Sequence, residues 1–386
     1  MKRFVFVCLL ALSSKAAAQW KYPATKQVEV TDTYFGKTYK DSYRWLENLK
    51  DEAVQAWFKM QAVLTDDTLA KIPARDALAK EWLALDKLQP ARYSSIHYEH
   101  GRVFYKKTLG GENVGKLYYR DGWRGAEKLL FDPATFRPKG AKPGDVTTIE
   151  DIMASPDGRQ VILRFSGGGA EYSELRVLDV KKHALLPDSI YPSYGPHGWM
   201  PDGKAFLYDS SRNTDIKSLD IELNRKTMLH KVGTAVATDI DVFSNENNPD
   251  LGISAREFPT AYTEESFPDY VLGQVGTVQR ERRLFIAPIA PLKTGGKLAW
   301  QVVSTLSDNL VRGSEYYKDK VYSITHTNAP NYKVVRTSFA HPDWKNEETV
   351  VPEAKDSLVS MTKSKNFLLL RYSNGIVERL VKYGLD

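Results

Sequence analysis

Pro156-Asp-Gly-Arg-Gln-Val-Ile-Leu163 is a tight polar turn followed by a short apolar run, and similar stretches recur along the 386-residue chain. The other five are His100-Gly-Arg-Val-Phe-Tyr105, Pro201-Asp-Gly-Lys-Ala-Phe-Leu-Tyr208, Pro249-Asp-Leu-Gly-Ile-Ser254, Lys318-Asp-Lys-Val-Tyr-Ser323 and Lys363-Ser-Lys-Asn-Phe-Leu-Leu369. With Gly101, Gly158, Gly203, Asp250, Asp319 and Lys365 as markers, the intervals are 57, 45, 47, 69 and 46 residues. A period near 45 with several strands in each unit is typical of a β-propeller, so we expect a mainly β chain with about six blades.

Three features of the repeat pattern have alternative interpretations. A β-sandwich with ordinary hairpins would also produce regular polar turns. The long fourth interval contains residues 259–276 and 288–296, which we interpret as extended loops or an insertion. Gly167-Gly-Gly169 could belong to a phosphate-binding loop, but no Gly-Lys-Ser/Thr and no helix start follow it. A flexible turn between strands at 161–165 and 174–179 is the better interpretation.

The repeats begin after a helical segment. Residues 19–46 carry Tyr, Pro, Gly and Trp without helical spacing, and a helix is predicted to start near Asp51-Glu52, where acidic groups suit the positive end of the dipole. The apolar residues of this helix and of a second one after Pro73 are Val54, Trp57, Leu64, Leu69, Leu78, Trp82, Leu85 and Leu88. We therefore divide the chain into a signal peptide at 1–18, an arm with two helices at 19–90, and a propeller at 91–386.

The first eighteen residues read as a secretory signal. Lys2-Arg3 is followed by the apolar run from Phe4 to Leu12, which is too short to span a bilayer, and then by an A-x-A site that predicts cleavage between Ala18 and Gln19. We expect a periplasmic or secreted protein with no stable membrane anchor. The only cysteine, Cys8, lies in this leader, so no disulfide is expected. The net charge of +6 is modest and the basic residues are scattered, which argues against a nucleic-acid partner.

The chain has no recognisable catalytic motif. The nearest match to G-x-S-x-G is Gly252-Ile-Ser-Ala-Arg256, where Arg256 replaces the second glycine in what we interpret as a strand of a blade. Ser254 is therefore not expected to be a nucleophile. None of the seven histidines lies in H-E-x-x-H, and His97-Tyr-Glu-His100 lacks a third ligand nearby. We assign no catalytic residue, no metal site and no cofactor.

Several motifs occur in an order that resembles one known family. They are Asp32-Thr-Tyr-Phe-Gly36, Asp41-Ser-Tyr-Arg-Trp-Leu-Glu47, Leu130-Phe-Asp-Pro133, Trp199-Met-Pro-Asp-Gly203, His230-Lys-Val-Gly-Thr234 and Asn328-Ala-Pro-Asn-Tyr-Lys-Val-Val335. Together they resemble the N-terminal arm and propeller of the prolyl oligopeptidase family of serine peptidases. Two positions depart from the family pattern, because Ser42 stands where a proline is usual and Ala134 where an asparagine is usual.

The resemblance implies a seven-bladed propeller joined to an α/β-hydrolase domain that carries Ser, Asp and His. About six blades and no hydrolase domain can be assigned here, so the resemblance implies that the propeller at 91–386 is incomplete at its C-terminus. We expect no peptidase activity from this chain alone. By alignment through Trp199, Tyr194 falls where the family places an aromatic residue near the substrate. Arg256 falls in a similar Arg-Glu strand. The plainer alternatives are a turn tyrosine and a salt bridge within a blade.

Two functions follow as hypotheses. The first is the substrate-gating portion of a secreted endopeptidase that cleaves short proline-containing peptides, with a catalytic hydrolase domain as its partner. The second is a periplasmic propeller that binds a peptide or protein without catalysis. An open terminal blade would leave a strand edge and apolar surface exposed, which the second hypothesis must explain.

Overall fold

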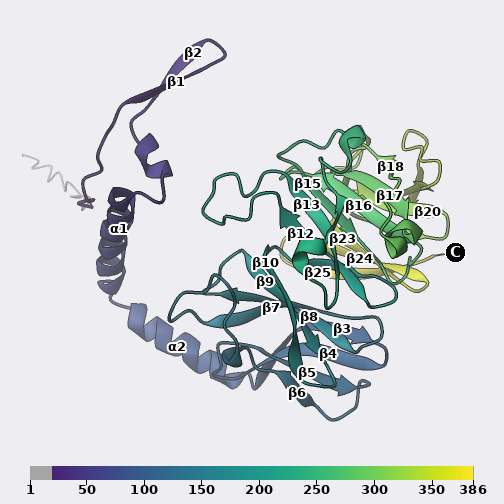
Figure 1. Cartoon of the computed structure of the whole chain (residues 1–386), viewed down its shortest axis with the longest axis horizontal. Helices are drawn as coiled ribbons and strands as arrows, with labels where there is room; N and C mark the ends of the chain where they lie inside the picture. The colour runs from purple at the N-terminus through teal and green to yellow at the C-terminus, as the bar shows by residue number, and fades with distance from the viewer. Residues whose placement is uncertain (1–19, 386) are drawn as a thin grey trace, which may run out of the picture. The chain divides into compact units, whose positions relative to one another are not determined.

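The computed structural model describes residues 20–385 and divides after Leu88 into two compact units (Figure 1). The predicted signal and its cleavage site between Ala18 and Gln19 lie outside the described residues. In the described part of the chain, no helix is long and apolar enough to cross a membrane.

The first unit is an arm built from a hairpin and two helices. Strands β1 (Val30–Tyr34) and β2 (Lys37–Asp41) form the antiparallel hairpin, the 3₁₀ helix η1 (Arg44–Glu47) follows, and then come α1 (Glu52–Ala70) and α2 (Arg75–Leu88). The guanidinium of Arg44 binds the carboxylates of Asp32 and Asp41. These bonds connect the two motifs that begin at Asp32 and at Asp41. Asp51 caps α1 by accepting a hydrogen bond from the Ala53 N–H at 2.8 Å.

The second unit contains six antiparallel sheets. The first sheet contains β3 (Ala91–Glu99), β4 (Arg102–Leu109), β5 (Lys116–Asp121) and β6 (Lys128–Phe131). The second contains β7 (Thr147–Ala154), β8 (Gln160–Gly167), β9 (Ser173–Asp179) and β10 (Ala184–Ser193). The third sheet contains β11 (Pro196–Trp199), β12 (Ala205–Ser211), β13 (Arg225–Lys231) and β14 (Ile240–Phe243). The fourth contains β15 (Phe258–Tyr262), β16 (Tyr270–Gly276), β17 (Arg283–Pro288) and β18 (Gln301–Ser304). The fifth sheet contains β19 (Leu310–Tyr317), β20 (Lys320–Thr325), β21 (Lys333–Ser338) and β22 (Glu348–Val351). The sixth contains β23 (Ser357–Ser364), β24 (Phe367–Ser373) and β25 (Glu378–Gly384).

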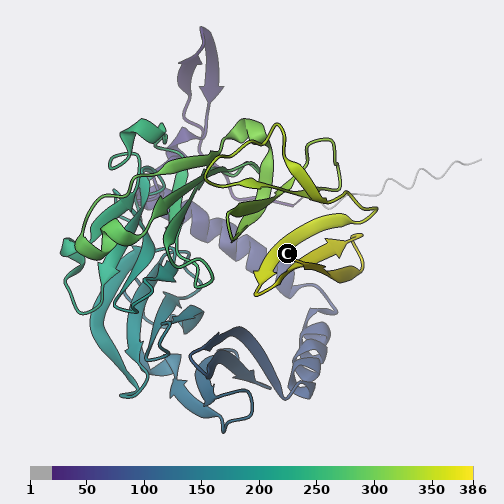
Figure 2. The same ribbon diagram turned by 90° about the vertical axis from the view of Figure 1, so that its right-hand side faces the viewer.

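Within each sheet the strands follow chain order, and the six sheets form a ring (Figure 2). First strands of neighbouring sheets contact one another, β3 with β7, β11 with β15 and β19 with β23, so the first strands are the inner ones. Short 3₁₀ helices lie between strands: η2 (Pro133–Thr135), η3 (Val236–Thr238), η4 (Pro249–Leu251), η5 (Ala290–Thr294) and η6 (Leu306–Asp308). The prediction of a six-bladed propeller is confirmed.

The core of the propeller lies between blades. Each of five apolar clusters joins one pair of neighbouring sheets, and the cluster of the first pair contains Phe104 and Leu117 from one sheet with Ile152 and Leu163 from the next. Because both faces of an internal blade are covered, strands such as β8 read as continuous apolar runs rather than as an alternating pattern.

The fourth blade begins later than the sequence suggested. Pro249–Leu251 form η4, which Gly252 ends in the left-handed region with φ 58°. The turn between the first two strands of this blade is instead residues 263–269. Residues 259–276, expected as an extended loop, therefore form most of β15, this turn and β16. A Pro-Asp-x-Gly stretch predicts that the chain turns locally, but it does not say which strands the turn connects. In the turn at 263–269, the ring of Phe267 stacks on that of Tyr270.

A buried histidine joins the second and third blades. His230 on β13 is fully buried, and its ring nitrogens lie 2.9 Å from Asp188 Oδ1 on β10 and 2.8 Å from Asp239 Oδ1. Burial lowers the pKa of His230, but the hydrogen bonds with the two carboxylates outweigh this effect and raise the pKa to about 9. The Gly233 N–H also donates to Asp188 Oδ1. The His-Lys-Val-Gly-Thr motif thus provides an inter-blade link.

We expect His230→Gln to lower the melting temperature of the chain, because it leaves two buried carboxylates without a cation. A histidine whose folded pKa is raised stabilises the fold fully below about pH 6.5, and this contribution is lost as the pH rises through about 9. The loss should be on the order of 3 kcal/mol near pH 6 and smaller near pH 9.5. Calorimetry at both pH values, with exposed His341→Gln as the control, tests this, and an equal effect at both would contradict it.

Candidate functional site

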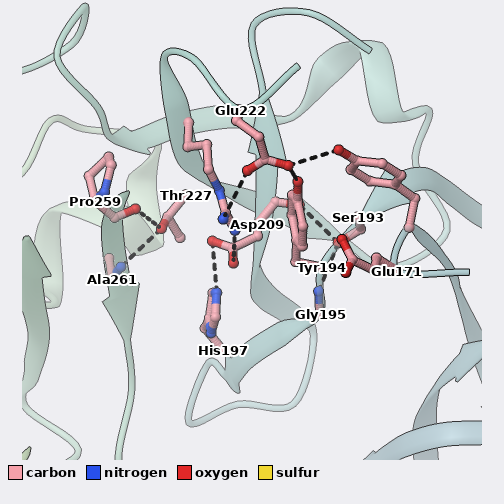
Figure 3. Close-up of polar contacts among 12 residues, drawn as sticks. Glu171, Ser193, Tyr194, Gly195, His197, Asp209, Glu222, Thr227, Pro259 and Ala261 are labelled. Atoms are coloured by element: carbon pink, nitrogen blue, oxygen red, sulfur yellow. Dashed lines mark hydrogen bonds and ion pairs between the residues drawn. The ribbon is translucent and has the colours of Figure 1, made fainter. Parts of the chain in front are cut away.

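Tyr194 lies just before β11, at the N-terminal end of an inner strand, and its side chain is half-buried. Figure 3 shows its hydroxyl bound to the carboxylate of Glu222. The Tyr172 hydroxyl donates to the same Glu222 oxygen at 2.8 Å, and the two tyrosine rings pack edge to face with centroids 5.2 Å apart. The tyrosine predicted to contact substrate is therefore held in one orientation by neighbouring side chains.

Arg225, the first residue of β13, is central to this cluster. Its guanidinium lies 3.8 Å from the centroid of the Tyr194 ring and 4.9 Å from that of Phe258, so it is enclosed by two aromatic rings. Its Nη2 donates to Asp209 Oδ2 at 3.0 Å, and its Nη1 lies 3.7 Å from Glu222 Oε2. A desolvated cation over an aromatic face contributes about 2 kcal/mol, so Arg225 fixes the position of the Tyr194 ring.

Asp209 on β12 connects Arg225 to the inner strand β11. Its Oδ1 lies 2.8 Å from His197 Nε2, although the two are not aligned for a hydrogen bond from the ring. Ser193 Oγ donates to the Asp209 carbonyl at 2.8 Å and accepts from the Gly195 N–H at 3.2 Å. These bonds fix the backbone on both sides of Tyr194.

The electrostatics of the cluster suit binding rather than proton transfer. Burial, together with the Glu222 carboxylate, raises the pKa of Tyr194 far above its usual range. Burial also raises the pKa of Tyr172. Both phenols therefore remain protonated hydrogen-bond donors at ordinary pH, and neither is poised to act as a general base.

Arg256 is placed differently from the sequence prediction. It lies in an exposed turn before β15 rather than in a strand. Its side chain makes no hydrogen bond or ion pair with any residue that the structure describes, which leaves the salt-bridge alternative without a partner. The neighbouring Ala255 carbonyl accepts a hydrogen bond from the Asn224 N–H at 2.8 Å, so this turn lies beside the start of β13. Whether Tyr194 and Arg256 contact substrate stays a prediction.

Ser254 lies in the same irregular segment, not in a strand of a blade as the sequence suggested. It is exposed, and its backbone N–H donates to Glu257 Oε2 at 2.8 Å. In the part of the chain that the structure describes, no group of three or more His, Cys, Asp or Glu side chains could hold a metal ion.

Sequence reasoning missed Glu222 and Arg225, which contact Tyr194, and Phe258, which packs on Arg225. Glu222 lies in a loop, Arg225 lies on β13, and Phe258 lies on β15 of the next blade. No local spacing relates these residues to Tyr194. The only available signal was that Phe258 closely follows the Arg256-Glu257 pair.

Comparison with known proteins identifies the propeller. A profile of the prolyl oligopeptidase N-terminal β-propeller domain matches residues 22–386. The chain belongs to this family. It is 24% identical over 379 residues to a prolyl endopeptidase of Elizabethkingia meningoseptica, covering 97% of this chain and 50% of the relative. It is 23% identical over 400 residues to prolyl oligopeptidase A of Galerina marginata, covering 94% and 52%.

Solved structures of the family have the same fold. A structure from a study of two prolyl endopeptidases superposes with a TM-score of 0.77 at 25% identity, covering 94% of this chain and 51% of that one. Prolyl oligopeptidase B of Galerina marginata gives a TM-score of 0.74 at 22% identity, covering 94% and 53%. The chain spans about half the length of the curated relatives it matches.

We expect Arg225→Ala to destabilise the chain by about 3 kcal/mol, because it leaves the buried Asp209 without its cation and uncovers one face of Tyr194. Arg225→Lys should be intermediate, since an ammonium cannot stack and pair in the same way. Arg212→Ala is the matched control, because among the described residues Arg212 forms an ion pair with Glu246 alone, and its side chain is 67% exposed, so its loss should cost less than about 1 kcal/mol. Urea denaturation measures all three, and equal losses for Arg225→Ala and Arg212→Ala would contradict the central role of Arg225.

Proposed function

We propose that this chain is the substrate-gating propeller of a secreted serine endopeptidase that cleaves short peptides after proline. The proposal rests on the position of Tyr194, whose half-buried aromatic ring is held by Arg225 and Glu222 just before the inner strand β11. Family membership supports it, since relatives with the same propeller are named prolyl endopeptidase and prolyl oligopeptidase. Export rests on the predicted leader at 1–18.

The catalytic groups would come from an α/β-hydrolase domain that acts as the partner of the propeller. The propeller would limit which peptides reach the catalytic groups, and it would place Tyr194 against the bound peptide. An aromatic ring offers an apolar face and a polar edge, which suits the ring of a proline and its neighbouring carbonyl. Arg256, exposed on the adjacent turn, would supply a cation to a peptide carbonyl or carboxylate.

Hydrolysis of a chromogenic Gly-Pro amide tests the proposal, using the purified chain beside the product of the complete reading frame. We expect no turnover by residues 19–386 alone, and turnover by any product that carries a Gly-x-Ser-x-Gly segment. A chain that binds proline peptides without turnover in either form would instead be a non-catalytic binding propeller.

In the active form, Tyr194→Ala should raise KM about tenfold with a smaller change in kcat, because it removes a binding surface rather than a reacting group. Tyr194→Phe keeps the ring and should raise KM about threefold or less, through loss of the bond to Glu222. Tyr39→Ala, in the exposed hairpin of the arm, is the control. An unchanged KM for Tyr194→Ala would remove Tyr194 from the substrate site.

A further inference from the structure

Two loops of neighbouring blades meet beside Tyr194. Residues 168–172 connect β8 with β9 in the second blade, and residues 212–224 connect β12 with β13 in the third. Because the strands of each sheet are antiparallel, both loops lie at the same end of the propeller as Tyr194. The Tyr172 hydroxyl, at the end of the first loop, donates to Glu222 Oε1 in the second at 2.8 Å. This hydrogen bond therefore joins two blades through residues 50 positions apart.

The first loop is packed tightly at its start and loosely beyond it. A Cβ atom on Gly167 would lie 2.5 Å from the Cβ of Ala141, so this end fits closely against residues 138–146. Gly168 and Gly169 have φ angles of 61° and 75°, in the left-handed region, and a Cβ on Gly169 would meet no atom within 4 Å. Successive glycines restrict the backbone little, so the position of the far end of the loop depends on side-chain contacts.

The contacts at the far end of this loop come from its own blade and from the Tyr194 cluster. Within the blade, Arg164 Nη2 donates to the Glu171 carbonyl at 3.4 Å, which is a long hydrogen bond. Tyr172 makes the contacts with the cluster. Its hydroxyl binds Glu222, and its ring packs on that of Tyr194 with centroids 5.2 Å apart and an angle of 64° between the planes. Tyr172 thus connects the first loop to both the ring and the carboxylate of the cluster.

The second loop is partly buried and partly exposed around Glu222. Ile221 is 5% exposed, whereas Leu219 is 76% exposed, so the loop enters solvent just before Glu222. The Glu222 side chain is itself 45% exposed, and its Oε1 accepts hydrogen bonds from the hydroxyls of both Tyr172 and Tyr194 (Figure 3). Because one oxygen serves both phenols, a displacement of the second loop disturbs both rings at once.

We propose that Tyr172 is a positioning residue that couples the loop at 168–172 to the loop at 212–224 through Glu222, so that the two loops and the Tyr194 ring are ordered together. Hydrogen bonds to a charged acceptor are stronger than neutral ones, and contributions that share one acceptor are not independent. The coupling of the loops goes beyond the proposed function and does not depend on it. Only the effect of Tyr172 on substrate binding rests on the proposed function.

Hydrogen–deuterium exchange of the purified chain tests the coupling. Tyr172→Phe removes the hydroxyl and keeps the ring, so we expect amides in both loops to exchange about fivefold faster, while those of β8 keep their wild-type rate. Tyr39→Phe, at an exposed tyrosine in the hairpin of the arm, is the matched control and should change neither loop. Unchanged exchange, faster exchange in the first loop alone, or faster exchange that extends to β8 would each overturn the proposal.

A double-mutant cycle tests whether Glu222 carries the coupling. Glu222→Ala removes the shared acceptor, so it should speed exchange at 168–172 about as much as Tyr172→Phe does, and the double variant should exchange no faster there. Asp220→Ala, at an exposed acidic residue of the same loop, should leave exchange at 168–172 unchanged. Additive effects of Tyr172→Phe and Glu222→Ala would show that the two residues act independently, which would overturn the proposal.

The effect on substrate is measured with the product of the complete reading frame. With a chromogenic Gly-Pro amide, Tyr172→Phe should raise KM about threefold and change kcat less than twofold, because the Tyr194 ring is less well held and no reacting group is altered. An unchanged KM would overturn the positioning role of Tyr172. A wild-type product that does not cleave the amide would contradict the proposed function, whereas the exchange measurements would still decide whether the loops are coupled.

Discussion

The propeller depends on one constraint: an internal blade has two apolar faces, and each must be covered by a neighbouring blade. Five clusters meet this constraint between six sheets, and aromatic side chains such as Phe165, Phe285 and Tyr316 contribute much of the buried surface. Burial of apolar area at about 25 cal/mol per Å² is the main term that holds the ring together. A single sheet cannot cover its own two apolar faces, so the repeat continues from blade to blade.

Apolar packing does not by itself fix how one blade is set against the next. At several interfaces a side chain from one blade reaches a backbone carbonyl of its neighbour. Lys106 binds the Ile149 carbonyl, Trp199 binds that of Met153, and Trp344 binds that of Val303. The same is true of Thr227 with Pro259 and of Lys363 with Tyr316. Such bonds are directional, and a buried donor left without its acceptor costs about 1–3 kcal/mol, so they specify one register.

The inner strands place chemistry at both of their ends. At the start of β11, Tyr194 is held by groups from three other elements, and at the end of the same strand Trp199 lines an acidic cavity. A strand of four residues thus links two sites of different character. One is an aromatic and cationic cluster whose charges are paired, and the other is a cavity lined by the carboxylates of Glu99, Glu264 and Glu265. The first suits a fixed binding surface.

The sequence alone determined the class of the fold, because polar turns at a regular period and apolar runs between them are local features. It also located the helices, where Asp51 caps α1. It misplaced the fourth blade, because a turn motif such as the one ending at Gly252 occurs wherever the chain reverses. Only the tertiary structure placed Arg225 against Tyr194 and gathered Glu99 with Glu264, since these residues come from different strands and blades. Contacts of that kind depend on how neighbouring blades pack against one another, which no spacing within the sequence encodes.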